Sequence, residues 1–261
     1  NDQLSGFRLG ALKVSTKDHI AVDGALTVDS GGDITLYAPD VQIGADLTAR
    51  GGSLRLGNVL NQFNGGANTD TRLAAKAEKT TQTRIAEGVH LDTRGLWSNL
   101  LTNPDDNASL AYLNGGLISI RSSVDIDVAA GSLLDVSSGG AILANGKTRG
   151  GKGGDLTLES SAISAPGKTR MNLDGELRGY GVTGGGVLMV QANGILVGQT
   201  DKALADNTLQ LSTDLFSKGF SAYNLIGLSG LDVAEGAAID VTLPVYRFGD
   251  AAPNQVSGVD P

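Results

Sequence analysis

Short runs of alternating apolar and polar residues recur along the chain, and each run follows a pair of glycines. The runs read GGDITL, GGSLRL, GGLISI, GGDLTL and GGVLMV, at residues 31–36, 51–56, 115–120, 153–158 and 185–190. Alternation with a period of two is typical of β-strands that bury one face. One turn and one short strand cannot bury an apolar face alone, so the recurrence predicts a solenoid of stacked repeats.

A second repeat supports the first. Residues 126–136 read IDVAAGSLLDV, residues 231–241 read LDVAEGAAIDV, and residues 86–93, AEGVHLDT, match the latter half of that pattern. Each copy reads as strand, glycine turn and strand. We expect the turn glycine to adopt a positive φ. The Asp that follows the apolar residue is expected to point outward, because neighbouring side chains on a strand alternate between faces.

The pattern breaks at four places, which we interpret as departures from the regular strands. Loops are expected near 61–84, with one helical turn within Leu73–Lys79, and near 96–114, where Asn103-Pro104-Asp105-Asp106 signals a turn. A short helix is predicted near 206–217, from Leu209, Leu211, Leu215 and Phe216 with Gly219 as its cap. Residues 246–261 are expected to form a frayed tail. The sequence thus predicts one solenoid segment over residues 1–245.

Repeat spacing and alternation also predict size and core. With about 20–25 residues in each coil, the regular portion would hold roughly nine to eleven coils, each stacked about 4.8 Å from the next. The alternation predicts a core of stacked aliphatic side chains that includes Val128, Leu133, Val136, Leu156, Leu158, Leu188 and Val190.

Composition narrows the class of protein. Glycine contributes 38 of the 261 residues, but no Gly-x-y period indicates collagen. Apolar residues make up 40% of the chain and occur in alternating runs, which argues against disorder. The net charge of −8 argues against nucleic acid as a partner. No apolar run reaches about 18 residues, so no direct membrane insertion is expected.

Several segments resemble a known family. They are GLWSN at 95–99, NGGLISI at 114–120, GSLLDVSSGG at 131–140, GGKGGDLTLES at 150–160 and LDGELRGYGVTGGGVLMV at 173–190. In this order they resemble the filamentous haemagglutinin-like exoproteins that two-partner systems secrete from Gram-negative bacteria. The resemblance implies an all-β fold, a right-handed parallel β-helix with extra-helical loops, and export through an outer-membrane transporter partner. The Asn-Pro-Asn-Gly type motifs of that family's secretion domain are missing, which favours an internal or C-terminal segment of a larger exoprotein.

The resemblance implies a secreted or cell-surface adhesin, acting as a rod and binding surface in adhesion or biofilm formation, with a surface polysaccharide or protein as ligand. No catalytic, metal or cofactor site is expected. The alternative is a polysaccharide lyase or hydrolase, because parallel β-helices also carry such enzymes. That alternative requires acids, bases and aromatic residues gathered in a groove on adjacent coils.

Two sets of residues are candidates for binding. Lys147/Arg149 and Lys168/Arg170 lie 21 residues apart, about one coil, so they are predicted to stack into a patch for an anionic ligand. Solvated corner loops are the alternative. Trp97, the single Trp, is a candidate for stacking on a sugar ring, although anchoring the base of its own loop is the favoured role.

Other chemical motifs are weak. GGKGGDLTL at 150–158 nearly fits the calcium-binding nonapeptide, but Thr157 occupies the large apolar position and the motif occurs once. We therefore interpret it as a glycine corner. His19 and His90 stand apart from any triad or metal-ligand spacing. The acidic pairs Asp105/Asp106 and Asp125/Asp127 are expected to be solvated.

Overall fold

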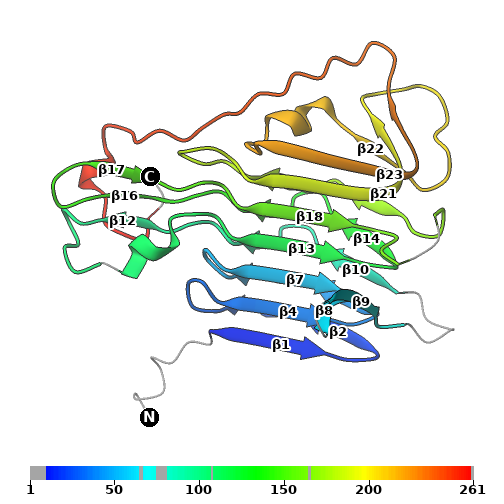
Figure 1. The fold of residues 1–261 in the computed structure, drawn as a ribbon, viewed down its shortest axis with the longest axis horizontal. Coiled ribbons are helices and arrows are strands. Elements are labelled where there is room, and N and C mark those ends of the chain that lie inside the picture. The colour runs from blue at the N-terminus through cyan, green and yellow to red at the C-terminus, as the bar shows by residue number, and fades with distance from the viewer. Residues whose placement is uncertain (1–9, 65–66, 75–80, 107, 164–165, 260–261) are drawn as a thin grey trace.

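The computed structural model describes residues 10–64, 67–74, 81–106, 108–163 and 166–259. The fold is all-β and most of its strand pairing is parallel. Sheet A has eight strands. Its first six follow one another up the stack in Figure 1, and the last two, β22 and β23, both pair with the sixth strand, β21. They are β1 (Ala11–Ser15), β4 (Asp33–Tyr37), β7 (Ser53–Gly57), β13 (Leu117–Arg121), β18 (Asp155–Glu159), β21 (Val187–Val197), β22 (Thr208–Leu211) and β23 (Ala222–Val233).

Two further parallel sheets have five strands each. Sheet B contains β2 (His19–Val22), β5 (Asp40–Ile43), β10 (Gln82–Ile85), β14 (Asp125–Val128) and β19 (Met171–Leu173). Sheet C contains β3 (Leu26–Thr27), β6 (Leu47–Thr48), β11 (His90–Asp92), β15 (Leu133–Asp135) and β20 (Glu176–Arg178). In the described part of the chain, the path visits sheets A, B and C in that order five times, and we call each passage a circuit.

The circuits differ greatly in length, so the expected nine to eleven coils were wrong. Asp33 pairs with Ser53, 20 residues further along the chain, whereas Ser53 pairs with Leu117, 64 residues further along. The next pair, Leu117 with Asp155, spans 38 residues. Insertions at the corners lengthen the path without adding a layer, because each insertion leaves and re-enters the same position in the stack.

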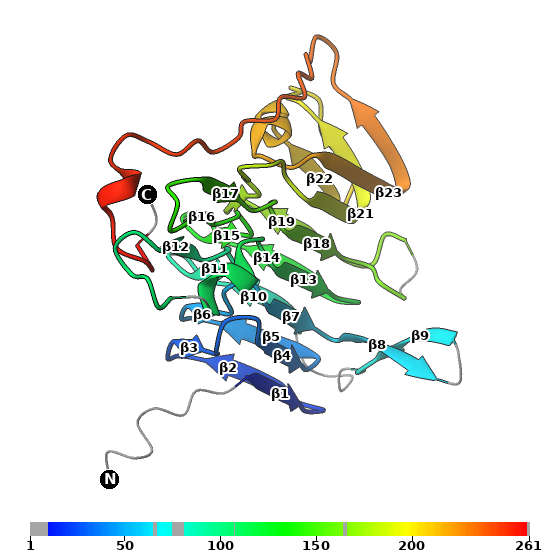
Figure 2. The same cartoon turned by 60° about the vertical axis from the view of Figure 1, so that its left-hand side comes forward.

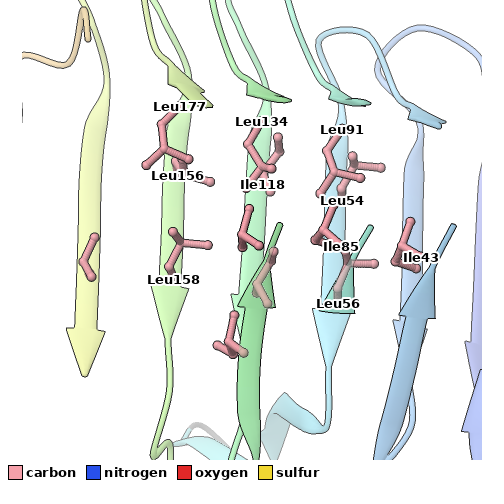
Figure 3. Packing of buried hydrophobic residues seen from close by; sticks show 14 of the residues in the cluster. Ile43, Leu54, Leu56, Ile85, Leu91, Ile118, Leu134, Leu156, Leu158 and Leu177 are labelled. Atoms are coloured by element: carbon pink, nitrogen blue, oxygen red, sulfur yellow. The ribbon is translucent and has the colours of Figure 1, made fainter. Parts of the chain in front are cut away.

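The core lies between the three sheets and consists of columns of aliphatic side chains. Leu54, Ile118 and Leu156 occupy matching register positions in successive circuits, and each is fully buried. Figure 3 shows these side chains together with Leu134 and Leu177, which project from sheet C. Full burial of such a side chain contributes about 1.5–3 kcal/mol of hydrophobic free energy. Parallel in-register pairing of apolar columns thus holds the circuits together.

The prediction of the core was right at six positions and wrong at one. Val128, Val136, Leu156, Leu158, Leu188 and Val190 are buried. Leu133 is only half-buried, and its neighbour Leu134 occupies the core position. Two consecutive leucines leave the register ambiguous, and a shift of one residue reverses the face.

The second glycine of each Gly-Gly pair has a steric role. A Cβ on Gly52 would lie 1.9 Å from the carbonyl oxygen of Gly32, one circuit away. The same approach joins Gly116 to Gly52 at 2.0 Å and Gly154 to Gly116 at 1.8 Å. Since these contacts are with backbone, only glycine fits. The turn glycines of the second repeat behave as predicted, with φ of 74° at Gly88, 79° at Gly131 and 77° at Gly236.

The first expected loop is more ordered than its composition indicated. Strands β8 (Val59–Asn64) and β9 (Ala67–Arg72) form an antiparallel hairpin that projects away from the three sheets in Figure 2. The end of the expected loop belongs to the core instead, because Gln82–Ile85 form β10, with Thr83 and Ile85 fully buried. Most of the helical turn expected within 73–79 lies outside the described residues.

The other departures from the pattern also contain strands. The second expected loop contributes β12 (Trp97–Asn99), which forms a corner sheet with β16 (Gly140–Ile142) and β17 (Thr148–Gly150), and a 3-10 helix at Ala108–Tyr112. The predicted helix near 206–217 was wrong over its first half. Leu209 and Leu211 lie in β22, and only Thr213–Ser217 are helical, as a 3-10 turn capped by Ser212.

The C-terminal segment is not frayed over its described residues. After β23 the chain runs back across the end of the stack to the corner sheet (Figures 1 and 2). Tyr246 donates a backbone hydrogen bond to Gly181, and Ala252 is buried as the first residue of a short 3-10 helix, Ala252–Asn254. The tail was misjudged because its polar residues bond to a partner segment that is remote in the sequence.

Candidate functional site

The two predicted basic pairs are not brought together. Lys147 and Arg149 belong to the β16–β17 hairpin, which lies between sheet C and the next strand of sheet A. Lys168 and Arg170 lie between sheet A and sheet B, where Arg170 directly precedes β19. Figure 1 places β17 on the left and β14, the partner of β19, on the right. All four side chains are exposed, but the predicted patch on one face was wrong. The 21-residue spacing fails here because the circuit is longer.

Trp97 is buried, with only 1% of its surface exposed. Its ring centroid lies 5.5 Å from that of Phe248, at an interplanar angle of 44°. Its backbone oxygen accepts a hydrogen bond from Gly258. The predicted loop contact on an exposed Trp was therefore wrong. Trp97 anchors the corner sheet, as the favoured interpretation held, and also the C-terminal segment.

A cavity of about 150 Å³ lies beside Trp97, and we call it the corner cavity. The described residues that line it come from four stretches of the chain: Arg94 and Trp97, Ser137 to Gly140, Val182, and Tyr246 to Phe248. Residues that follow the strands of sheet C form one wall of the cavity, and the corner sheet forms another. The C-terminal segment packs over both walls. The cavity therefore exists only when the remote C-terminal residues are docked.

A charged column adjoins the cavity on the outer face of sheet C. Asp92 and Asp135 are register partners on β11 and β15. Arg94 donates to both carboxylate oxygens of Asp92, at 3.0 and 2.9 Å, and lies 4.0 Å from Asp135. Arg50 lies 3.7 Å from Asp92 and donates to the backbone oxygens of Arg94 and Gly95. The carboxylates are thus embedded among guanidinium groups.

The surroundings shift the pKa values of Asp92 and Asp135 in opposite directions. Burial raises the pKa of Asp92, but the hydrogen bonds and charges of Arg94, with the charge of Arg50, outweigh it, so that the pKa is lowered. Burial dominates at Asp135, where the hydrogen bonds from Ser137 compensate only in part and the pKa is raised. Asp135 was expected to point outward from its strand. It points outward from sheet C but is covered, with 4% of its surface exposed.

Hydroxyl and aromatic groups complete the surroundings of the cavity. Ser137 donates its backbone N–H to Asp135 at 2.8 Å, and its hydroxyl oxygen accepts from the backbone of Tyr180 at 3.1 Å. The rings of Tyr180 and Tyr246 lie 5.5 Å apart. Burial raises the pKa of both phenols, so both remain neutral at physiological pH. These contacts fix the C-terminal segment against the sheet edge.

Two buried polar side-chain atoms in this part of the chain lack a hydrogen-bond partner. They are the indole Nε1 of Trp97 and the hydroxyl oxygen of Thr93. A buried donor without an acceptor costs about 1–3 kcal/mol, so the packing around Trp97 must outweigh that cost.

The remaining candidates have structural partners. Asp127 lies 3.3 Å from Arg84 and accepts from Asn172, while Asp125 accepts from the backbone of Arg170. Asp155, in the near-match to the calcium motif, accepts from the backbone of Val187. Among the described residues, no three His, Cys, Asp or Glu side chains cluster in a way that could hold a metal ion. No helix in this part of the chain is long and apolar enough to cross a membrane.

Sequence reasoning missed most of the corner cavity. One signal was available, because Leu-Asp recurs at 91–92 and 134–135 in successive copies of the second repeat, which places Asp92 beside Asp135. Nothing in the local pattern indicated that residues 246–248 would close the cavity. In the comparisons with known proteins, the chain matches no family model, no curated protein and no solved structure.

Proposed function

We propose that the stacked circuits form a right-handed parallel β-helix and that the chain is a segment of a secreted adhesin of the filamentous haemagglutinin type. The observation that carries the proposal is the in-register stacking of the Gly-Gly strands. Glycine contacts such as that between Gly116 and Gly154 recur from circuit to circuit and allow close axial stacking. The family-like segments in the sequence add the secretion route and the surface location.

In this proposal the segment works as a rod that holds a binding surface away from the cell. Export would proceed through an outer-membrane transporter partner, and folding would follow on the outside. The absence of Cys suits this route, since an unfolded chain without disulfides can cross a pore and then be held by its core alone. The ligand class consistent with the family resemblance is a surface polysaccharide or protein, contacted by loops at the corners.

Gene deletion in the source bacterium tests the adhesive role. The deletion strain should lose surface attachment and biofilm mass, and complementation with the complete gene should restore both. A matched strain should carry the gene with residues 115–184 removed in frame, which takes out two circuits of the stack. Unchanged attachment in the deletion strain, or a product that stays inside the cell in the wild type, would contradict the proposal.

A polysaccharide lyase or hydrolase remains the second candidate because of one observation. The charged column and corner cavity gather acids, bases and aromatic rings on neighbouring circuits, as that alternative requires. However, Asp92 is held in ion pairs, and Asp135 is covered. Incubation with pectin, alginate and hyaluronate, followed by absorbance of unsaturated products and by reducing-end assay, separates this candidate from the adhesin. Product formation that disappears in Asp135→Asn would favour the enzyme.

A further inference from the structure

The last layer of the stack, residues 222–243, carries an apolar face that the described residues leave open. Strand β23 pairs with β21 along one edge, and no described strand pairs with its other edge. Leu231 and Val233 continue two columns of the core, because their register partners are buried there: Ile195 and Val197. Register partners on parallel strands share one face, yet 42% of Leu231 and 52% of Val233 are exposed. The core columns therefore end here without a cover.

The last layer also keeps the apolar pattern of an interior layer. The second repeat occurs inside the stack as IDVAAGSLLDV and again in the last layer as LDVAEGAAIDV. Leu134 and Val136 of the interior copy are fully buried, whereas the equivalent Ile239 and Val241 are exposed. A solenoid that ends in solution needs a terminal repeat with a polar outer face. This end lacks such a face over its described residues, so its sequence suits a layer that another layer covers.

The first layer, residues 10–28, presents an unpaired edge at the opposite end of the stack. Strand β1 pairs with β4 on one side, and no described strand lies on its other side (Figure 1). Asp33 donates its backbone N–H to Gly10, and the equivalent residue of β1, Ala11, has no such acceptor among the described residues. A Cβ on Gly32 would lie 2.4 Å from the backbone oxygen of Gly10, whereas a Cβ on Gly10 would meet no atom within 4 Å. The first layer thus has the donor and the clearance for a further circuit beneath it.

The two end layers match each other in length and in apolar pattern. Residues 11–22 contain β1 and β2, residues 222–233 form β23, and both stretches have 12 residues. Aligned without a gap, they bring four apolar pairs together: Leu12 with Tyr223, Val14 with Leu225, Ile20 with Leu231, and Val22 with Val233. These are the positions at which each layer continues the core columns. One end can therefore extend the columns that the other end leaves open.

Charge decides which ends meet. The first layer has two Lys and two Asp, so its formal charge is 2 − 2 = 0 with His neutral. The last layer has two Asp, one Glu and no basic residue, which gives −3. Two last layers in contact would bring like charges together, whereas a first layer on a last layer would not. Pairing between two last layers about a twofold axis would also be antiparallel, while all described pairing in sheet A is parallel.

We propose that the first layer of one copy of this chain docks on the last layer of a second copy, so that copies stack head to tail. In the contact, β1 and β2 pair in parallel with β23, whose unpaired edge is a template for another strand. The contact joins two different surfaces and does not close on itself, so further copies extend the rod. The inference goes beyond the proposed function, because a chain that stays monomeric would still serve as a segment of an adhesin.

Sedimentation velocity of the 261-residue chain over a range of concentrations tests the proposal. The wild type should form dimers and longer species whose share rises with concentration. Val14→Asp places a charge in the first layer and Val233→Asp places one in the last layer, so each variant alone should associate at least tenfold more weakly. Val256→Asp is the matched control, because Val256 is 53% exposed in the C-terminal segment, and it should associate as the wild type does. Thermal melting checks that each variant is folded.

A mixture of the two end variants tests the direction of stacking. Val14→Asp keeps an intact last layer and Val233→Asp keeps an intact first layer, so an equimolar mixture should form dimers but no longer species. A mixture that stays monomeric, or Val14→Asp that associates alone as the wild type does, would rule out the head-to-tail contact. A wild type that is monomeric at every concentration would overturn the proposal and leave the two ends to other occupants, such as further circuits of a longer chain.

Discussion

The side-chain amide of Asn99 donates to the backbone oxygen of Gln255 at 2.7 Å, and this bond joins the corner sheet to the C-terminal segment. The same Nδ2 lies 3.2 Å from the oxygen of Ala252 and 3.1 Å from that of Pro253. Asn99 is fully buried. One side chain thus gathers several carbonyl groups of a segment whose own composition would leave it disordered.

Removal of this amide should release the C-terminal segment. Asn99→Ala leaves buried carbonyl groups without a donor, at an expected cost of about 1–3 kcal/mol. Arg247 should then be cut much faster by trypsin, and the cleavage site can be identified by mass spectrometry. Asn145→Ala, in an exposed turn, is the control and should leave the cleavage rate unchanged. Equal protection of Arg247 in both variants would show that Asn99 does not hold the segment.

The glycine contacts between circuits should tolerate no side chain. Gly154→Ala places a Cβ 1.8 Å from the backbone oxygen of Gly116, so the circuits must separate locally. We expect a loss of about 1–3 kcal/mol or more in the free energy of unfolding. Gly24→Ala is the matched control, because a Cβ there meets no atom within 4 Å. Denaturant unfolding measures both, and similar midpoints for the two variants would contradict the steric role.

Two adjacent positions give a direct test of register in the core. Leu134→Ala should cost about 2–5 kcal/mol, because Leu134 is fully buried in the column between Leu91 and Leu177. Leu133→Ala should cost clearly less, since Leu133 is half-buried on the outer side of sheet C. The comparison is internally controlled, because both changes remove the same atoms one residue apart. A larger loss at Leu133 would mean that sheet C is shifted by one residue.

Two deletions should show that the fold depends on β10 but not on the β8–β9 hairpin. Replacement of residues 61–70 by a short Gly-Ser link removes the tip of a hairpin whose strands pair only with each other, so the thermal transition should fall by only a few degrees. The main loss is the ion pair between Asp70 and Arg121, at 2.8 Å. Deletion of 61–84 also removes most of β10 and should abolish cooperative unfolding. Identical melting of the two deletions would show that β10 is dispensable.

The charged column predicts opposite pH dependences. The pKa of Asp92 is lowered in the folded state, so its ion pairs stabilise the protein above the ordinary value of 3.8 and are lost as pH falls below it. Asp92→Asn should therefore lower the free energy of unfolding at pH 7. Below pH 3.8 its free energy of unfolding should approach that of the wild type. The pKa of Asp135 is raised, so its ionisation costs stability as pH rises above 3.8.

The free energy of unfolding of Asp135→Asn, relative to that of the wild type, should accordingly be higher at pH 7 than at pH 3.5. Denaturant unfolding at both pH values checks the two variants together. For each variant, the free energy of unfolding relative to the wild type is compared between the two pH values. A change of the same sign for Asp92→Asn and Asp135→Asn would contradict the opposite pKa shifts. Asp174→Asn, at an exposed position directly after β19, is the control for removal of a surface charge.

The sequence by itself determined the repeating strands and most of the core. Alternation sets which face of a strand is apolar, and the Gly-Gly pairs mark where circuits touch, so Leu156, Leu158 and Leu188 were predicted as buried without any coordinates. Glycine turns such as Gly131 were predicted for the same local reason, because only glycine adopts a positive φ at little cost. These features depend on residues close together in the chain.

Only the tertiary structure decided the length of each circuit and everything built at the corners. Insertions between strands leave no periodic trace, so the spacing of Lys147 and Lys168 was misread as one coil. Thr83 reads as polar loop in the sequence, yet in-register pairing with Val41 and Ile126 buries it. The corner cavity requires Trp97 and Phe248 to meet. That contact arises from packing between distant segments, and local propensity carries no information about it.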